Sequence, residues 1–113
     1  MAAKYVLKKS KNGQLFFNLL ATNGQIILSS ELYAAKAGAL NGIESVRKNG
    51  VVPARFDKLN GKDGAPYFTL TASNGQVIGR SEMYTSTAGR DNGIASVMKN
   101  AADAMLDDQS AAA

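Results

Sequence analysis

The sequence predicts an α+β protein made of two tandem β-β-β-α repeats, whose six strands form one mainly antiparallel sheet. Two observations carry this prediction. Sliding the chain by 51 positions aligns residues 5–50 with 56–101, and close to half of the aligned residues are identical. Within each copy, apolar residues first alternate as in a strand and then recur at helical spacing. We therefore expect a single domain, 1–113, with repeats at 4–50 and 55–101.

Each copy is expected to begin with three strands. The first reads KYVLKKS in one copy and, more weakly, ARFDKL in the other, and the second reads QLFFNLLA or APYFTLTA. The dipeptide Asn-Gly, at 23–24 and 74–75, then precedes QIILSS and QVIGRS. Because Asn-Gly tolerates positive φ at both central turn positions, it predicts a two-residue hairpin turn.

That turn would pair Leu19 with Leu28 and Ala21 with Ile26, which fixes the face on which each side chain lies. A shift of one residue would swap the two faces. We expect the core face to carry Phe17, Leu19, Ala21, Ile26, Leu28, Phe68, Leu70, Ala72 and Val77. The opposite face would carry Phe16, Asn18, Leu20, Ile27, Tyr67, Thr69, Thr71 and Ile78.

Residues near 35–49 and 86–100 fit helices. Ser86 can cap the second helix, whereas Ala35 leaves the first without a capping side chain. Each helix has two internal glycines four residues apart (38 and 42, 89 and 93), and each glycine costs about 1 kcal/mol relative to alanine. They predict either close backbone approach or a kinked helix. Residues 102–113 would form a helix extension or a disordered tail.

A unit of about 45 residues is too small to bury a stable core alone. Two units side by side would extend one sheet across a pseudo-twofold axis and place both helices on one face. The chain would then be a monomer that contains an internal pseudo-dimer.

The composition excludes several kinds of chemistry. The chain has no histidine and no cysteine, so we expect no Ser-His pair, no cofactor and no metal site. Glu31 and Glu82 are the only acidic residues that match between the copies, and no phosphate-loop motif occurs. We therefore expect no catalytic activity. No stretch is long and apolar enough to span a membrane, and a cytoplasmic location is the expectation.

The repeated motif Ser-Glu-(Leu/Met)-Tyr is the best candidate for binding. Its glutamates and tyrosines could line two equivalent pockets where the third strand leads into the helix. Alternatively, its serines and glutamates could satisfy free N–H groups near the helix start, with the tyrosines closing the core. The mid-helix asparagines are open to the same two interpretations. The candidate residues are Glu31, Tyr33, Asn41, Glu82, Tyr84 and Asn92.

Two other surfaces are candidates. The second face of the sheet could bind a protein partner through Phe16, Leu20, Tyr67 and Thr71. The net charge is +4, and residues 1–50 carry seven Lys/Arg against two Glu, so a polyanion is the alternative partner. Its contacts would be Lys4, Lys8, Lys9, Lys11, Arg47 and Lys48.

The combined pattern, an Asn-Gly turn followed by SExY and then GxxNGIxSVxKN, resembles the YegP-like family of small bacterial proteins over residues 4–101. The resemblance implies a β3-α unit that is present twice, in tandem or as a dimer. It also implies one continuous sheet, with the C-terminal helices exchanged across the pseudo-dyad. The family has no assigned biochemical activity, so the resemblance supports the fold and leaves a small binding module as the leading hypothesis.

Overall fold

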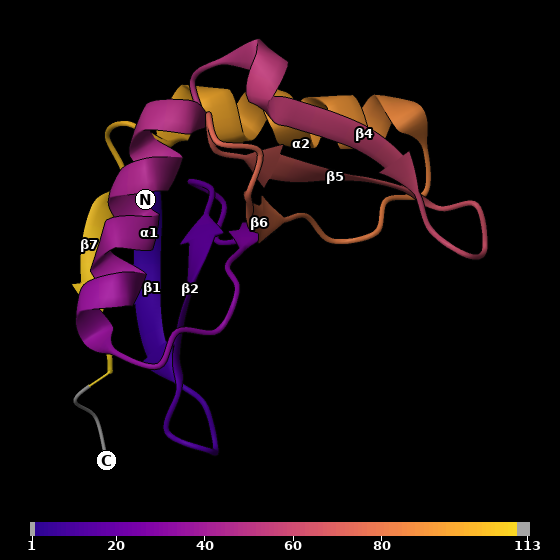
Figure 1. Cartoon of the computed structure of the whole chain (residues 1–113). Helices are drawn as coiled ribbons and strands as arrows, with labels where there is room; N and C mark the ends of the chain where they lie inside the picture. Colours follow the sequence, from indigo (N-terminus) through magenta and orange to yellow (C-terminus); the bar gives the residue numbers. More distant parts are fainter. Residues whose placement is uncertain (1, 111–113) are drawn as a thin grey trace.

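The computed structural model describes residues 2–110, which form one seven-stranded sheet and two α-helices. Helices α1 (Lys36–Asn49) and α2 (Thr87–Asn100) follow the third strand of each repeat, and a short 3₁₀ helix, η1 (Pro53–Arg55), precedes the second repeat. The sheet order is β4-β5-β6-β3-β2-β1-β7 (Figure 1). The strands are β1 (Lys4–Lys9), β2 (Leu15–Leu20), β3 (Ile26–Ser29), β4 (Phe56–Asn60), β5 (Pro66–Thr71), β6 (Val77–Arg80) and β7 (Met105–Asp108).

The two repeats join at the centre of the sheet, where β3 lies antiparallel to β6 through the pair Ser29 and Arg80. In Figure 1, β1 and β2 run steeply while β4 and β5 lie across them, so the sheet is strongly twisted between its two ends. The predicted α+β architecture with a tandem repeat is therefore confirmed. No helix among the described residues has the length and apolarity that a membrane crossing needs.

The seventh strand corrects the prediction of six. Residues 102–113 were expected to extend the helix or to be disordered, but α2 ends at Asn100 and Met105–Asp108 form β7, parallel to β1. The part of that prediction concerning residues 111–113 lies outside the described residues. Two ion pairs hold β7 in place: Lys4 Nζ lies 3.2 Å from Asp107, and Lys36 Nζ lies 2.5 Å from Asp108. Neither pair could be read from the local sequence.

We expect β7 to loosen in acid. Hydrogen bonds from Gln109 and, to a smaller extent, from Lys4 lower the pKa of Asp107. Hydrogen bonds from Lys36 and Ser110 lower the pKa of Asp108 to about 2. A lowered folded-state pKa stabilises the fold above the ordinary value of 3.8, and this stability is lost as the pH falls toward about 2.

Hydrogen exchange, corrected for intrinsic rates, should show the β7 amides losing protection across that window before the β2 amides do. Lys36→Ala should shift the loss of β7 protection to higher pH. Equal loss in β2 and β7, with no effect of Lys36→Ala, would contradict this role of the ion pairs.

The hairpin turns differ from the predicted two-residue Asn-Gly turn. Three residues separate Ala21 from Gln25, and only Gly24 has a positive φ, of 84°. The side chain of Asn23 instead accepts a hydrogen bond from the Gln25 N–H at 3.0 Å. The second repeat has the same turn, with a φ of 85° at Gly75. Asparagine thus favours this turn through its side chain rather than through positive φ.

This turn is followed by a β-bulge that changes the register. Leu19 pairs with Leu28 as predicted, but Ile26 pairs with Leu20 and not with Ala21. The bulge lets two successive residues, Ile27 and Leu28, both be buried. The prediction that placed Ile27 and Ile78 on the face opposite the core was therefore wrong, as was the placement of Ile26 and Val77 on the core face, since they are 38% and 37% exposed. The predicted core residues Phe17, Leu19, Ala21, Phe68 and Leu70 are buried.

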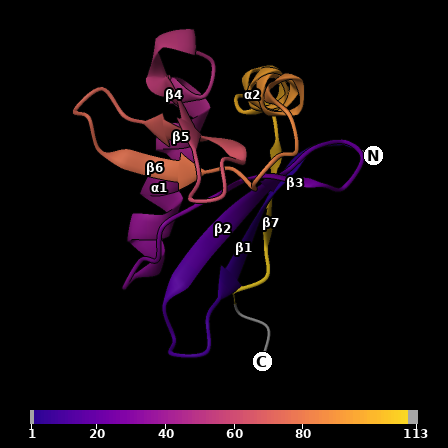
Figure 2. The same cartoon turned by 90° about the vertical axis from the view of Figure 1, so that its right-hand side faces the viewer.

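Each helix contacts strands of both repeats. α1 lies against β2 of its own repeat and against β5 and β6 of the other, while α2 lies against β5 and β3 (Figures 1 and 2). The end of α2 is tied to β1, because the Tyr5 hydroxyl donates a 2.6 Å hydrogen bond to the Ala101 carbonyl. One cluster of buried side chains includes residues from both helices and both halves of the sheet. As predicted, Ser86 caps α2 by accepting from the Gly89 N–H, and Ala35 provides no side-chain cap.

Candidate binding grooves at the repeat interface

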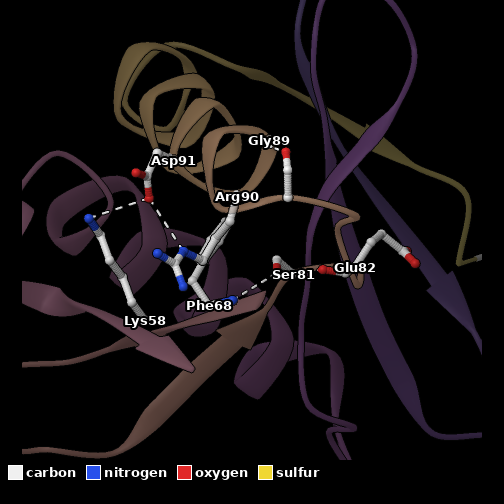
Figure 3. Close-up of polar contacts among 8 residues, drawn as sticks. Lys58, Phe68, Ser81, Glu82, Gly89, Arg90 and Asp91 are labelled. Carbon is white, nitrogen blue, oxygen red and sulfur yellow. Dashed lines mark hydrogen bonds and ion pairs between the residues drawn. The ribbon is translucent and has the colours of Figure 1, made fainter. Parts of the chain in front are cut away.

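The serines of the repeated Ser-Glu-x-Tyr motif are structural. The hydroxyl of Ser30 accepts a 2.8 Å hydrogen bond from the Phe17 N–H and donates to the Glu31 carbonyl. Ser81 does the same with Phe68 and Glu82 (Figure 3). Each serine therefore fastens the end of the third strand of its repeat to the neighbouring strand.

The tyrosines explain the helical glycines. A Cβ added to Gly42 would lie 2.8 Å from Tyr33 Cζ and 3.0 Å from Phe17 Cε2, so only a residue without a side chain fits. Gly93 has the same relation to Tyr84 and Phe68. Gly42 and Gly93 thus allow a close approach, but the group that approaches is a tyrosine ring of the same repeat and not the backbone of a neighbouring helix or strand, whereas at Gly38 and Gly89 the nearest atom to an added Cβ is 3.3 Å away. Each ring also stacks on the core phenylalanine, with centroids 6.3 Å apart for Tyr33 and Phe17.

The glutamates have no such structural role. Among the described residues, neither the Glu31 nor the Glu82 carboxylate forms an ion pair or accepts a hydrogen bond, and both residues are exposed. The suggestion that the serines and glutamates satisfy N–H groups at the helix start is therefore wrong, because the serines accept from strands β2 and β5 instead. Figure 3 shows Glu82 pointing away from Ser81, toward the violet strands of the first repeat. Two matching carboxylates are thus free to meet a ligand.

Two open grooves lie beside these carboxylates, at equivalent places in the fold. The first groove, of about 480 Å³, is lined by Gly24, Gln25, Ile26, Ile27, Glu82 and Tyr84. The second groove, of about 540 Å³, is lined by Glu31, Leu32, Tyr33, Gln76, Val77 and Ile78. Adding or subtracting 51 converts the residue numbers of one groove into those of the other for the glutamate, the tyrosine, the glutamine and the two branched apolar residues. Each groove combines the Glu and Tyr of one repeat with the hairpin of the other.

The first groove continues along α2 into a smaller hollow of about 230 Å³. Gln25, Ile27 and Tyr84 line both spaces, and Asn92 lines the hollow. The structure therefore brings three predicted residues together, namely Glu82, Tyr84 and Asn92. Asn41, the counterpart of Asn92, is exposed on α1 and does not line the second groove.

The hairpin residues were missed in the sequence because they come from the other repeat. Glutamine directly follows Asn-Gly at Gln25 and Gln76, but the same tripeptide also occurs at residues 12–14, outside both grooves, so it does not single out the groove residues.

Burial raises the pKa of the Tyr33 and Tyr84 phenols, and the neighbouring Glu31 and Glu82 carboxylates raise it further. Both phenols are therefore neutral at physiological pH and can donate a hydrogen bond. The grooves offer a carboxylate, an apolar wall and neutral polar groups. In the described part of the chain, no group of three or more His, Cys, Asp or Glu residues could hold a metal ion.

The two other candidate surfaces are less well formed. Phe16, Leu20, Tyr67 and Thr71 are half-buried in the sheet, and Tyr67 lies in a separate hollow, with the Arg80 guanidinium 5.9 Å from its ring.

The proposed anion contacts do not all remain available. Lys4 is paired with Asp107. Arg47 lies over the Tyr5 ring and donates to the Ala102 carbonyl. The cations that stay exposed are Lys8, Lys9, Lys11 and Lys48.

The chain matches one protein family twice, over residues 10–57 and 62–108, and that family is described as a domain of unknown function, DUF1508. A UPF0339 protein of Bordetella pertussis is 56% identical over 99% of this chain and 100% of its own length. UPF0339 protein YegP of Yersinia pestis is 52% identical over 92% of this chain and 93% of its own length.

Two solution NMR structures share the fold. A UPF0339 protein of Shewanella oneidensis has a TM-score of 0.91 and 52% identity, covering 97% of this chain and 93% of that one. The E. coli protein yegP, described as of unknown function, has a TM-score of 0.93 and 42% identity, covering 100% and 97%. The chain therefore belongs to the DUF1508 family, as a tandem-repeat protein of the UPF0339 group to which YegP also belongs.

Proposed function

We propose that the protein is a non-catalytic binding module whose two grooves each take a cationic group attached to a short apolar segment. The observation that supports this proposal is the pair of equivalent grooves, each with an exposed, unpaired glutamate. A groove formed once could be incidental to packing. The same residue types line both grooves, 51 positions apart in the sequence. Glu31 and Glu82 are among them, although neither carboxylate forms a contact that stabilises the fold.

The lining defines the chemistry of the ligand. The Glu82 carboxylate attracts an ammonium or guanidinium group and repels an anion. Ile26 and Ile27 provide an apolar wall for the carbon chain that carries the charge. The neutral Tyr84 phenol and the Gln25 amide can both donate and accept hydrogen bonds. A lysine or arginine side chain next to an apolar residue of a peptide has this combination.

The duplication gives one chain two such sites. A partner that presents two basic groups at a matching spacing would bind more tightly than either group alone, because the second contact forms intramolecularly. A monomer with an internal pseudo-dimer is sufficient for this bivalent binding. We favour the grooves over the basic surface because Lys4 and Arg47 are already engaged within the protein.

Three probes of similar size test the proposal: n-butylammonium, n-butanol and n-butyrate. In ¹⁵N-labelled protein at low salt, butylammonium should shift the amides of residues 25–27 and 82–84 and those of residues 31–33 and 76–78. Butanol should shift them less, and butyrate should leave them unchanged. Equal shifts with all three probes, or shifts only outside these segments, would refute a cation-binding role.

A further inference from the structure

A separate hollow of about 670 Å³ lies beside the hairpin that joins β4 to β5, and we call it the hairpin hollow. It shares no lining residue with the two grooves, so the proposed binding of cations makes no use of it. Its lining consists of Asn60, Gly61, Lys62, Asp63, Tyr67, Arg80 and Met83.

The side chains of Tyr67 and Arg80 lie on the same face of the sheet. Arg80 pairs with Thr69 between β6 and β5, and Tyr67 precedes Thr69 by two residues, so all three side chains leave the sheet on one side. The Arg80 guanidinium lies over the Tyr67 ring, 5.9 Å from its centroid. The Met83 side chain reaches the hairpin turn, because a Cβ built on Gly61 would lie 3.4 Å from the Met83 sulfur. An aromatic ring, a thioether and a guanidinium therefore meet in one hollow.

The charges of the hairpin hollow are not used by the protein itself. Arg80 is exposed, and among the described residues its side chain forms no ion pair and donates no hydrogen bond. The same holds for the exposed Lys62. Asp63 is the carboxylate of the lining, and its Oδ1 already accepts a 3.0 Å hydrogen bond within the turn. Asp57 is on the same face but is separated from Arg80 by β5 and does not line the hollow. Two cations against one carboxylate leave an excess of one positive charge.

This combination belongs to the second repeat alone. The positions of the first repeat that correspond to Tyr67, Arg80 and Met83 hold Phe16, Ser29 and Leu32. The first repeat therefore lacks the guanidinium at this place, although both repeats supply a groove. The protein thus carries its own comparison for the role of Arg80.

We propose that the hairpin hollow binds a carboxylate that is attached to an aromatic ring. A guanidinium that lies over a ring keeps its in-plane N–H groups free, and Arg80 can hold both oxygens of a carboxylate in a planar pair. The ligand's ring would pack beside Tyr67 and against the Met83 thioether. A single excess positive charge suits a monoanionic carboxylate better than a dianionic phosphate. Because the hollow and the grooves share no lining residue, each proposal can fail without the other.

Benzoate is the probe, and benzamide, which is neutral and of nearly the same shape, is the matched control. At millimolar concentration, benzoate should shift the amides of residues 61–63, 67 and 80 in the ¹⁵N-labelled full chain. Benzamide should bind about tenfold more weakly, because the charge-assisted pair is lost. Butyrate, which lacks the ring, should not shift these amides at the same concentration, since an exposed ion pair alone contributes little. Equal shifts with benzoate and either control, or no shift at residues 61–63, 67 and 80, would overturn the proposal.

Two protein variants separate this site from a general attraction to a basic protein. Arg80→Ser gives the second repeat the residue of the first and should weaken benzoate binding about tenfold. Lys11→Gln also removes one positive charge, at the position that corresponds to Lys62, and should leave benzoate binding unchanged. Equal weakening by both variants would overturn the proposal. If Arg80→Ser does not fold, the comparison of benzoate with benzamide on the unaltered protein decides.

Discussion

Replacing Gly42 or Gly93 by leucine is expected to lower the free energy of unfolding by about 3 kcal/mol or more, although leucine favours helix better than glycine does. The physical reason is the ring packed across each glycine. Even a single Cβ at Gly42 would lie within 3.0 Å of Tyr33 and Phe17, both of which are fixed by the core. Urea unfolding followed by circular dichroism measures the change.

Ala37→Leu is the matched control, because Ala37 lies on the same helix but is exposed. We expect that substitution to change stability by no more than about 0.5 kcal/mol. Combining Gly42→Ala with Tyr33→Ala should cost less than the sum of the two single changes, since the ring that meets the new Cβ is gone. Unchanged or increased stability of Gly42→Leu would show that the glycines are not retained for close packing.

Replacing Tyr5 by alanine should have an effect of similar or larger size, about 3–5 kcal/mol. The side chain is fully buried, its ring lies edge-on to Phe17, and its hydroxyl satisfies the Ala101 carbonyl at the end of α2. Removing it creates a cavity and leaves that carbonyl without its partner. Tyr5→Phe removes only the hydrogen bond and should cost about 1 kcal/mol.

Phe56, the counterpart of Tyr5 in the second repeat, provides the comparison. It is only partly buried and has no hydroxyl to hold the opposite helix. Phe56→Ala should therefore destabilise the protein distinctly less than Tyr5→Ala, as measured by the same urea titrations. Equal losses would mean that the tie between α2 and β1 contributes little to stability.

The repeated sequence predicted most of the fold because each local signal agreed with the tertiary structure. The positions of the Asn-Gly turns, though not their type, the two helices and the Ser86 cap all follow from short segments. The bulge at Ile27 and the strand β7 do not, since each depends on contacts with distant residues. Met105–Asp108 has no alternation of apolar and polar residues, and its ion pairs join it to Lys4 and Lys36, which lie far away in the chain.

One wall of the first groove was predicted from the sequence, and the other was not. Glu82 and Tyr84 stood out because their motif occurs twice, and the sequence left open whether the motif binds or only supports the fold. The structure assigns the serine and the tyrosine to packing and leaves the glutamate free. The opposite wall, Gln25–Ile27, was not predicted because it comes from the other repeat, which is joined to this one by the pairing of β3 with β6.

The two grooves can serve as each other's control in a single molecule. Glu31→Gln and Glu82→Gln each remove one charge, and because neither carboxylate has a partner in the described structure, both variants should keep their stability within about 0.5 kcal/mol. In a butylammonium titration, Glu82→Gln should abolish the shifts at residues 25–27 and leave those at residues 76–78. Glu31→Gln should do the reverse. Unaltered shifts in both grooves of either variant would contradict the central claim that these glutamates make two equivalent cation-binding sites.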